Sequence, residues 1–215
     1  MQIDFYFFMR KYIISLLFIF TNLTFVYSQM KYQNGDFVFV YGDTSSFDDA
    51  IVSVSKSPKN IDFSHVGIVH CTDSGIFIIE AITQGVCYTP IDIFLYRNLN
   101  TKIQIARLKD DFQRYIPYAI TNVLTRLGKK YDFNFDLKND SYYCSELLYL
   151  AFVEASGDTL FFETPPMTFI DKTTNEFHKY WVTYFKELNI DIPEGKPGLN
   201  PNGMSFSDKL MWVME

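Results

Sequence analysis

The sequence predicts an α+β fold in which an antiparallel sheet packs against helices. Two apolar stretches of strand length, His65–Cys71 and Gly75–Ala81, are joined by only three residues, which indicates an antiparallel hairpin. Further along, apolar residues recur at helical spacing in Phe112–Leu127 and again in Cys144–Gly157. A hairpin followed by amphipathic helices predicts a sheet with helices packed on it.

The first 28 residues are expected to lie outside this domain. Arg10 and Lys11 precede the apolar stretch Tyr12–Tyr27, which is the layout of a secretory signal peptide. We therefore expect a signal peptide at 1–28 and one exported domain at 29–215, located in the periplasm or outside the cell. The alternative is a retained membrane anchor, but the uncharged stretch is shorter than the about 20 residues of a usual membrane span. After cleavage, no membrane span is expected.

Apolar runs bounded by turn residues predict the remaining elements. Strands are expected at Phe37–Tyr41, His65–Cys71, Gly75–Ala81, Val86–Tyr88 and Ile103–Leu108. Helices are expected at Phe47–Val54, Pro90–Leu95, Phe112–Leu127 and Cys144–Gly157. In the third helix, Pro117 is expected to bend the first turns, and Gly128 ends the helix. The C-terminal part is less regular: 183–188 fits a strand or a helix end, 193–203 is expected to be an irregular arm, and 210–213 is a last apolar segment.

Composition excludes some classes of function. Hydrophobic residues make up 48% and aromatic residues 18% of the 215 residues, which suffices for one domain with its own core. The formal net charge is −6 and no long basic run is present, so a nucleic-acid partner is not expected. The three cysteines, Cys71, Cys87 and Cys144, leave at least one thiol outside a disulfide. A bond between Cys71 and Cys87 and two separate buried thiols both remain open.

Cys144 is the candidate nucleophile. A polar, turn-rich run ends just before Ser141 and an apolar helical pattern begins at Leu147, which places Cys144 in the first turn of a helix. The unpaired N–H groups and partial positive charge of a helix N-terminus favour a thiolate and can also stabilise an oxyanion. For an arbitrary cysteine, a buried structural thiol is the more common case. The assignment therefore depends on a base within reach.

A thiol nucleophile needs a base, and the sequence contains three histidines. His65 opens the first strand of the hairpin. His70 lies an odd number of positions further along, so it is expected on the opposite face of that strand. His178 lies in a polar stretch and is expected in solvent. His65 is therefore the candidate base.

The hairpin register supplies an orienting group for His65. Suppose that Thr72 lies opposite Gly75. His65 then faces Ile82, and Glu80 lies on the same face of the sheet, one diagonal step away. A slip of one residue would put the two side chains on opposite faces. Glu80 is the only charge in its strand, and the alternative interpretation is a strand-edge carboxylate in water.

The same residues carry a resemblance to a known family. The chain is similar to the permuted papain-like hydrolases of the YiiX/YaeF type, which are relatives of the NlpC/P60 superfamily. The matching stretches, in order along the chain, are Gly35-Asp36, Ser64–Ile68, Glu80, Gly85-Val86, Tyr131–Phe133, Tyr143–Leu147 and Pro193–Pro201. The resemblance implies a circularly permuted papain-like fold in which the histidine precedes the cysteine, and a triad that falls on Cys144, His65 and Glu80. It implies no metal and no cofactor.

The expected function is that of an exported thiol hydrolase, an amidase or peptidase that acts on peptides or peptidoglycan fragments through a thioester intermediate. The candidates for the oxyanion site are the backbone N–H of Cys144 and the side chains of Tyr143 and Tyr41. Two alternatives remain open. One is a lipid-directed esterase or acyltransferase of the same fold, whose acyl groove the many Phe and Tyr rings would line. The other is a non-enzymatic binding protein with an inert thiol.

Overall fold

The computed structural model describes residues 32–42, 45–55, 62–157, 159 and 161–214. Its contacts divide the chain into Met1–Gln33 and Asn34–Glu215. All of the strands and helices described belong to the second unit. The predicted signal peptide, 1–28, lies outside the described residues. Within the described ranges, no helix has the length and apolar composition needed to cross a membrane.

Six antiparallel strands form one sheet in the order β4-β3-β2-β1-β5-β6. The strands are β1 Phe37–Tyr41, β2 Phe63–Thr72, β3 Gly75–Ile82, β4 Gly85–Pro90, β5 Ile103–Leu108 and β6 Leu210–Met214. The last apolar segment of the sequence is thus an edge strand, because β6 pairs with β5. The predicted α+β class with an antiparallel sheet is confirmed.

The β2–β3 hairpin has the predicted register. Thr72 lies opposite Gly75, and the regular ladder extends as far as Ile68 opposite Ile79. Toward its first residues, β2 also carries a bulge against β1 next to His65. His65 is the last residue of β2 that pairs regularly with β1, opposite Val40, and the bulge follows it directly.

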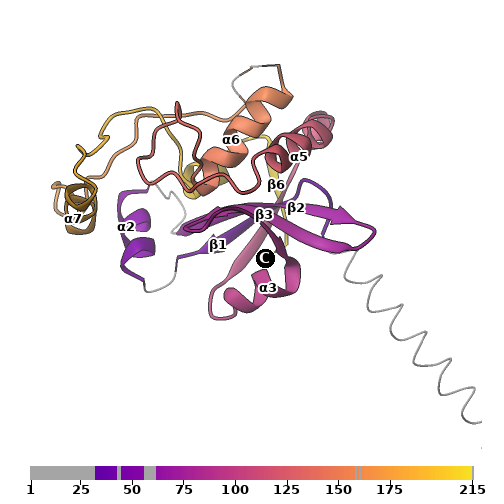
Figure 1. Cartoon of the computed structure of the whole chain (residues 1–215), viewed down its shortest axis with the longest axis horizontal. Coiled ribbons are helices and arrows are strands. Elements are labelled where there is room, and N and C mark those ends of the chain that lie inside the picture. The colour runs from indigo at the N-terminus through magenta and orange to yellow at the C-terminus, as the bar shows by residue number, and fades with distance from the viewer. Residues whose placement is uncertain (1–31, 43–44, 56–61, 158, 160, 215) are drawn as a thin grey trace, which may run out of the picture. The chain divides into compact units, whose positions relative to one another are not determined.

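Helices cover both faces of the sheet. They are α2 Ser46–Val54, α3 Ile91–Arg97, α4 Asp110–Gln113, α5 Ile116–Thr125, α6 Cys144–Ala155, α7 Lys179–Glu187 and α8 Pro201–Ser205. α5 and α6 lie side by side on one face, and α3 lies against β3 and β4 on the other (Figure 1). α6, whose first residue is Cys144, contacts β2 and β3, the strands that carry His65 and Glu80.

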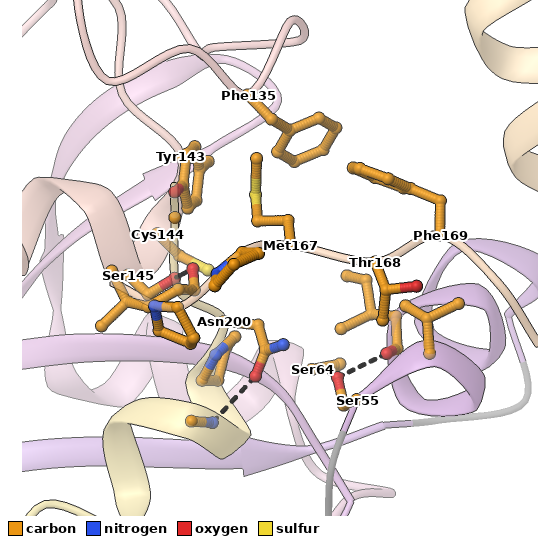
Figure 2. A pocket seen from close by; sticks show the side chains of 18 of the residues that line it. Ser55, Ser64, Phe135, Tyr143, Cys144, Ser145, Met167, Thr168, Phe169 and Asn200 are labelled. Carbon is orange, nitrogen blue, oxygen red and sulfur yellow. Dashed lines mark hydrogen bonds between the residues drawn. The ribbon is translucent and has the colours of Figure 1, made fainter. Parts of the chain in front are cut away.

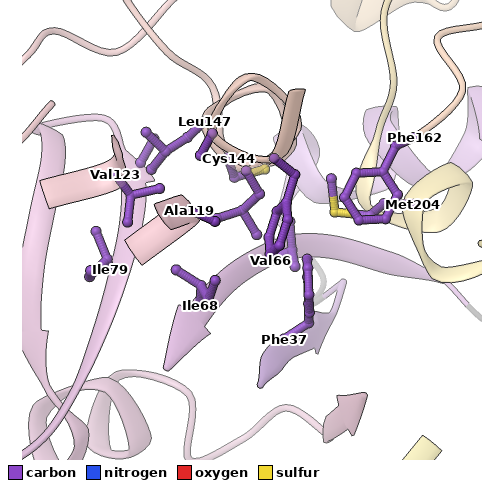
Figure 3. Close-up of a cluster of buried hydrophobic side chains, with 14 of the residues drawn as sticks. Phe37, Val66, Ile68, Ile79, Ala119, Val123, Cys144, Leu147, Phe162 and Met204 are labelled. Carbon is purple, nitrogen blue, oxygen red and sulfur yellow. The ribbon is translucent and has the colours of Figure 1, made fainter. Parts of the chain in front are cut away.

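The main core fills the space between the sheet and the α5–α6 pair (Figure 3). Phe37 is fully buried, and its ring stacks on that of Phe152 in α6 with 5.5 Å between the centroids. Val66 and Ile68, alternate residues of β2, both belong to this core, as expected for side chains on one face of a strand. Burying one such side chain contributes about 1.5–3 kcal/mol. The cluster therefore fixes α6, and with it Cys144, against the sheet.

The helix predicted at Phe112–Leu127 is in fact two helices, α4 and α5, with a break at Arg114 and Tyr115. Pro117 explains the break. Proline has no N–H, and its ring collides with the carbonyl group four residues earlier, here that of Gln113, the last residue of α4. Pro117 was expected to bend one helix, and the structure instead has two separate helices at this point.

The C-terminal part is more regular than the sequence patterns predict. The segment at 183–188, expected to be a strand or a helix end, belongs almost entirely to α7, and the arm at 193–203 leads into the short helix α8. His178 immediately precedes α7, which packs against α2. Its side chain is only 18% exposed, so the expectation that it lies in solvent is wrong.

A second buried cluster lies around α7. Its buried residues are Ala50, Val54, Phe135, Tyr143, Phe169, Trp181 and Phe185. The indole of Trp181 donates a hydrogen bond to the carbonyl of Ala50 at 3.0 Å, which ties α7 to α2. Several of these rings also line a pocket beside Cys144. Part of the aromatic surplus of the sequence is therefore concentrated near the candidate nucleophile.

Candidate active site

Cys144 is the first residue of α6 and is 6% exposed. The residue before it, Tyr143, has an extended backbone, and its N–H donates to a carboxyl oxygen of Glu146 at 3.0 Å. This contact belongs to a capping box, which fixes where the helix begins. The sulfur therefore lies at the predicted helix end, where N–H groups are unpaired and the partial charge is positive.

His65 lies between Glu80 and Cys144. Its Nε2 atom is 2.7 Å from Oε2 of Glu80. The ring also makes a hydrogen bond with the side chain of Cys144, and because Nε2 is engaged by Glu80, Nδ1 is the nitrogen left for the sulfur. The structure thus brings together the three side chains that the sequence singles out.

Glu80 has two further partners that were not predicted. The side chain is fully buried and accepts a hydrogen bond from Oγ1 of Thr89 at 2.7 Å. It also pairs with Arg97, whose Nη2 lies 2.7 Å from Oε1 and 2.6 Å from Oε2. Thr89 pairs with Ile78 in β3, so the same diagonal argument places it on the face of Glu80 and could have identified it. Arg97 was missed because the helix predicted to end at Leu95 continues to Arg97.

The surroundings hold His65 and Glu80 as an ion pair. Burial disfavours the imidazolium, but the hydrogen bonds to Cys144 and Glu80 outweigh it and raise the pKa of His65 to about 10. Burial likewise disfavours the carboxylate, but the hydrogen bonds from His65 and Arg97 outweigh it and lower the pKa of Glu80 to about 2. At neutral pH, a protonated His65 therefore donates to the carboxylate of Glu80, and its other ring nitrogen is left for the sulfur of Cys144.

Two pockets meet at Cys144. The first, here called the apolar pocket, has a volume of about 320 Å³. It is lined by residues of α2, α7 and α8 and by the segments around them, and its labelled side chains include Phe135, Met167 and Phe169 (Figure 2). Cys144 lies at one end of this lining in the close-up (Figure 2). An extended apolar group therefore fits directly beside the sulfur.

The second, here called the polar pocket, has a volume of about 390 Å³. Its polar and charged side chains include Asp48, Ser64, His65, Thr83, Gln84, Arg97, Asn98 and Thr101. Cys144, Tyr131 and Ser64 line both pockets, whereas His65 lines only the polar one. The thiol therefore stands at the junction of an apolar and a polar site.

Three tyrosines line one or both of the pockets that meet at the thiol. Two of them are the predicted side-chain candidates for the oxyanion site. Tyr143 lines the apolar pocket, and its ring centroid lies 5.3 Å from that of Phe135. Tyr41 lines the polar pocket, and its ring centroid lies 4.7 Å from that of Phe63. Tyr131, which was not a candidate, lines both pockets with Cys144, and burial, followed by the charge of Cys144, raises its pKa. A tyrosine kept neutral beside the sulfur can donate a hydrogen bond to an oxyanion.

The other histidines and cysteines lie outside both pockets. Nδ1 of His70 is 2.9 Å from the hydroxyl of Tyr88, and burial lowers the pKa of that imidazole. No disulfide joins Cys71 and Cys87 in the described part of the chain, and burial raises the pKa of both thiols. Among the residues that the structure describes, no group of three or more His, Cys, Asp or Glu side chains is arranged to hold a metal ion.

Comparisons with known proteins find relatives of the domain. A family model described as "Permuted papain-like amidase enzyme, YaeF/YiiX, C92 family" matches residues 31–214. Over 118 residues, the chain is 28% identical to the uncharacterised protein YiiX of Escherichia coli strain K12. This match covers 51% of the chain and 58% of that relative, less than two thirds of the relative's length.

A solved structure shares the fold. It is described as a crystal structure of the metalloprotein YiiX from Escherichia coli O157:H7, and it matches with a TM-score of 0.69 at 23% sequence identity. The match covers 85% of this chain and 97% of that chain. The architecture is therefore shared over nearly the whole of that protein.

Proposed function

This chain belongs to the family of permuted papain-like amidases of the YaeF/YiiX type, and we propose that it hydrolyses amide bonds with Cys144 as nucleophile, His65 as base and Glu80 as orienting group. The observation that carries the proposal is the position of His65, whose ring bonds Oε2 of Glu80 at 2.7 Å and also bonds the Cys144 side chain. A nucleophile, a base and an orienting group in hydrogen-bond contact are the parts of a nucleophilic triad. The proposed catalytic domain is 29–215, preceded by a signal peptide at 1–28.

In the first step, the thiolate of Cys144 attacks the amide carbonyl carbon and a C–S bond forms. His65, as imidazolium, gives its proton to the amide nitrogen while the C–N bond breaks and the amine leaves. A thioester remains on Cys144. In the second step, the neutral His65 takes a proton from water, the water oxygen attacks the thioester, and the C–S bond breaks to release the carboxylic acid. Glu80 holds the ring of His65 and stabilises its cation throughout.

Negative charge develops on the former carbonyl oxygen in both steps. We assign the backbone N–H of Cys144 and the hydroxyl of Tyr131 as its hydrogen-bond donors. Tyr131 is favoured because it lines both pockets together with the nucleophile. The predicted candidates Tyr41 and Tyr143 are less suited, because each lines only one of the two pockets.

Two substrate classes fit a thioester mechanism. Peptides or peptidoglycan fragments are supported by the amidase description of the family and by the signal-peptide pattern at 1–28, which would deliver the enzyme to the periplasm or the exterior. A lipid ester or acyl donor is favoured by the apolar pocket, where rings such as Phe135 and Phe169 lie beside the nucleophile. Both substrate classes would form a thioester on Cys144, and they differ in the acyl group that this thioester carries.

One of the related structures is described as that of a metalloprotein. In the described part of this chain, no group of three or more His, Cys, Asp or Glu side chains fits a metal ion. The available ligands therefore do not match a metal centre, and every proposed step uses the chain's own side chains.

Trapping the acyl-enzyme tests the proposed function. The purified full chain is incubated with peptidoglycan fragments or with phospholipid vesicles, quenched in acid and examined by intact mass spectrometry with peptide mapping. We expect one acyl group on Cys144, with amide fragments released from the first substrate or free fatty acid from the second. Cys71→Ser is the matched control and should still be acylated, because Cys71 lies outside both pockets. An adduct that persists in Cys144→Ala, or no adduct and no product with either substrate, contradicts the proposal.

A further inference from the structure

The proposed reaction determines which part of the substrate enters each of the two pockets. His65 gives its proton to the leaving amine, so that amine must lie within hydrogen-bond reach of the ring. His65 lines the polar pocket but not the apolar one. The leaving amine therefore occupies the polar pocket, and the acyl group extends from Cys144 into the apolar pocket.

Besides the protonated His65, Arg97 brings a positive charge to the lining of the polar pocket. Its side chain is 38% exposed, and the Glu80 carboxylate uses only one of its nitrogens, Nη2. Among the described residues, none accepts a hydrogen bond from Nε or Nη1. The guanidinium also lies 5.4 Å from the centre of the buried Phe94 ring, which limits its movement. A fixed guanidinium with available N–H groups can bind a carboxylate through two parallel hydrogen bonds.

Asp48 lines the same pocket and is the reason to consider a cationic leaving group instead. Its carboxylate already accepts a hydrogen bond from Oγ of Ser64 at 2.8 Å. It also lies in the first turn of α2, where the helix dipole stabilises negative charge. Asp48 thus has a structural role, whereas Arg97 keeps donors for a ligand, and this difference favours an anion.

We propose that Arg97 binds a carboxylate on the leaving amine, so that the substrates are amides whose leaving group is an amino acid with a free carboxylate. N-acyl amino acids and peptides that lose their C-terminal residue share this chemistry. The polar pocket, at about 390 Å³, is near the small end of the range for small-molecule sites, which suits a single residue. The inference rests on the proposed thiol hydrolysis: one C–N bond breaks, water supplies OH to the acyl group and H to the amine, and nothing is oxidised or reduced.

Amide substrates whose leaving amines carry a negative, a neutral or a positive group test this inference. The purified full chain is given N-octanoyl alanine, its neutral carboxamide and the cationic N-octanoyl ethylenediamine. The tripeptide Leu-Leu-Ala and its C-terminal amide form the peptide arm and distinguish the two sources of the carboxylate. Amine release gives kcat/KM for each substrate. Hydrogen bonds to the charged Arg97 should favour the carboxylate over the carboxamide by about 10- to 100-fold.

Two variants separate carboxylate binding from the orientation of Glu80. Arg97→Gln loosens Glu80 and lowers kcat/KM for both members of a pair, but it should also abolish the preference for the carboxylate. Glu80→Gln loosens His65 in a comparable way while Arg97 stays in the pocket, so activity should fall and the preference should remain. In a Cys144→Ala variant, calorimetry should show tighter binding of the carboxylate member without turnover.

The outcomes distinguish this inference from the proposed function. Equal rates for carboxylate and carboxamide, with hydrolysis that depends on Cys144, overturn the inference and leave the proposed function standing. A preference for the ethylenediamine amide also overturns it and assigns the pocket to Asp48. If no pair is hydrolysed, the proposed amidase function fails for these substrates. Equal binding of both members by Cys144→Ala then overturns the carboxylate site as well, and tighter binding of the carboxylate retains it.

Discussion

The hydroxyl of Thr89 donates a buried hydrogen bond of 2.7 Å to Oε1 of Glu80. His65 bonds the other oxygen, Oε2, and Arg97 donates to both, so each oxygen of the carboxylate has donors. Burying a carboxylate without such donors is strongly unfavourable. Thr89 and Arg97 therefore allow Glu80 to remain charged within an otherwise apolar strand, directly behind His65.

Replacing Thr89 with valine removes one of these donors with little change in volume. We expect the free energy of unfolding to fall by about 1 kcal/mol, the contribution of a typical hydrogen bond. We also expect kcat to fall about fivefold with KM nearly unchanged, because Glu80 is less well oriented while the substrate contacts remain. Steady-state kinetics and denaturant unfolding measure the two effects. Thr125→Val, which removes an exposed hydroxyl, is the control, and an unaltered kcat in Thr89→Val would limit Thr89 to a structural role.

His65 should titrate far above the ordinary histidine pKa of 6.5, because its bonds to Cys144 and Glu80 raise its pKa to about 10. NMR titration of the ring C–H signals should therefore show a protonated His65 at neutral pH. The pKa of His65 is higher in the folded protein than in the unfolded chain. The pairing therefore stabilises the fold fully below about pH 6.5, and this contribution is lost as the pH rises through about 10. His65→Gln should accordingly lower the free energy of unfolding more at about pH 6 than at about pH 10.

A variant of the sulfur checks the origin of this shift. Cys144→Ala removes one of the two hydrogen bonds, so the titration midpoint of His65 should move to lower pH. His70 is an internal control whose midpoint should not move, because it bonds Tyr88 and lies outside both pockets. A His65 midpoint that stays unchanged would mean that the sulfur does not stabilise the imidazolium.

The parts of the site that could be predicted from the sequence depend on local geometry. A three-residue connection and the alternation of strand side chains determine which residues share a face, and Thr72 does lie opposite Gly75. The start of α6 at Cys144 could be predicted for the same reason, because the end of a turn-rich run and apolar spacing are local features.

The parts that could not be predicted depend on contacts between distant segments. Arg97 reaches Glu80 because α3 continues two residues beyond its predicted end. The apolar pocket combines α2, the segment around Phe135, 163–169 and 198–206, none of which is periodic with respect to the others. His178 is half-buried because α7 packs on α2, which its polar neighbours in sequence do not indicate.

Glu146 should be neutral at physiological pH. Burial raises its pKa to about 9, and Oε1 has no hydrogen-bond partner among the described residues. The unfolded chain releases this proton near pH 4.5 and the folded chain keeps it to about pH 9, so stability falls as the pH rises between those values. Glu146→Gln can still accept the N–H of Tyr143 and should raise the free energy of unfolding by about 1 kcal/mol or more at about pH 8, with little change at about pH 5.

Denaturant unfolding of Glu146→Gln and the wild type at the two pH values measures this effect. Glu187→Gln, at an exposed position of α7, is the control and should show no gain at either pH. Parallel pH dependence of Glu146→Gln and the wild type would mean that Glu146 is already ionised in the folded protein.

Gly85 allows the turn between β3 and β4 to pack closely against the backbone of the segment after α5. It has a φ of 109°, and a Cβ at this position would lie 2.3 Å from the carbonyl oxygen of Lys129. Two backbone hydrogen bonds hold the same contact, from the N–H of Val86 to the carbonyl of Lys129 and from the N–H of Gly128 to the carbonyl of Val86, both 2.9 Å. The backbone of Lys129 therefore cannot move away from an added Cβ without breaking these two hydrogen bonds.

Gly85→Ala should lower the free energy of unfolding by about 3 kcal/mol or more, because left-handed backbone strain and a clash with main-chain atoms act together. Gly195→Ala is the matched control: its φ is 77°, but no described atom lies within 4 Å of the added Cβ, so only the strain of about 1 kcal/mol applies. Denaturant unfolding of the two variants under the same conditions gives the difference. The turn between β3 and β4 carries Thr83 and Gln84 of the polar pocket, so the residual activity of folded Gly85→Ala should also fall. Equal losses of stability in the two variants would mean that the close approach to Lys129 does not hold this turn.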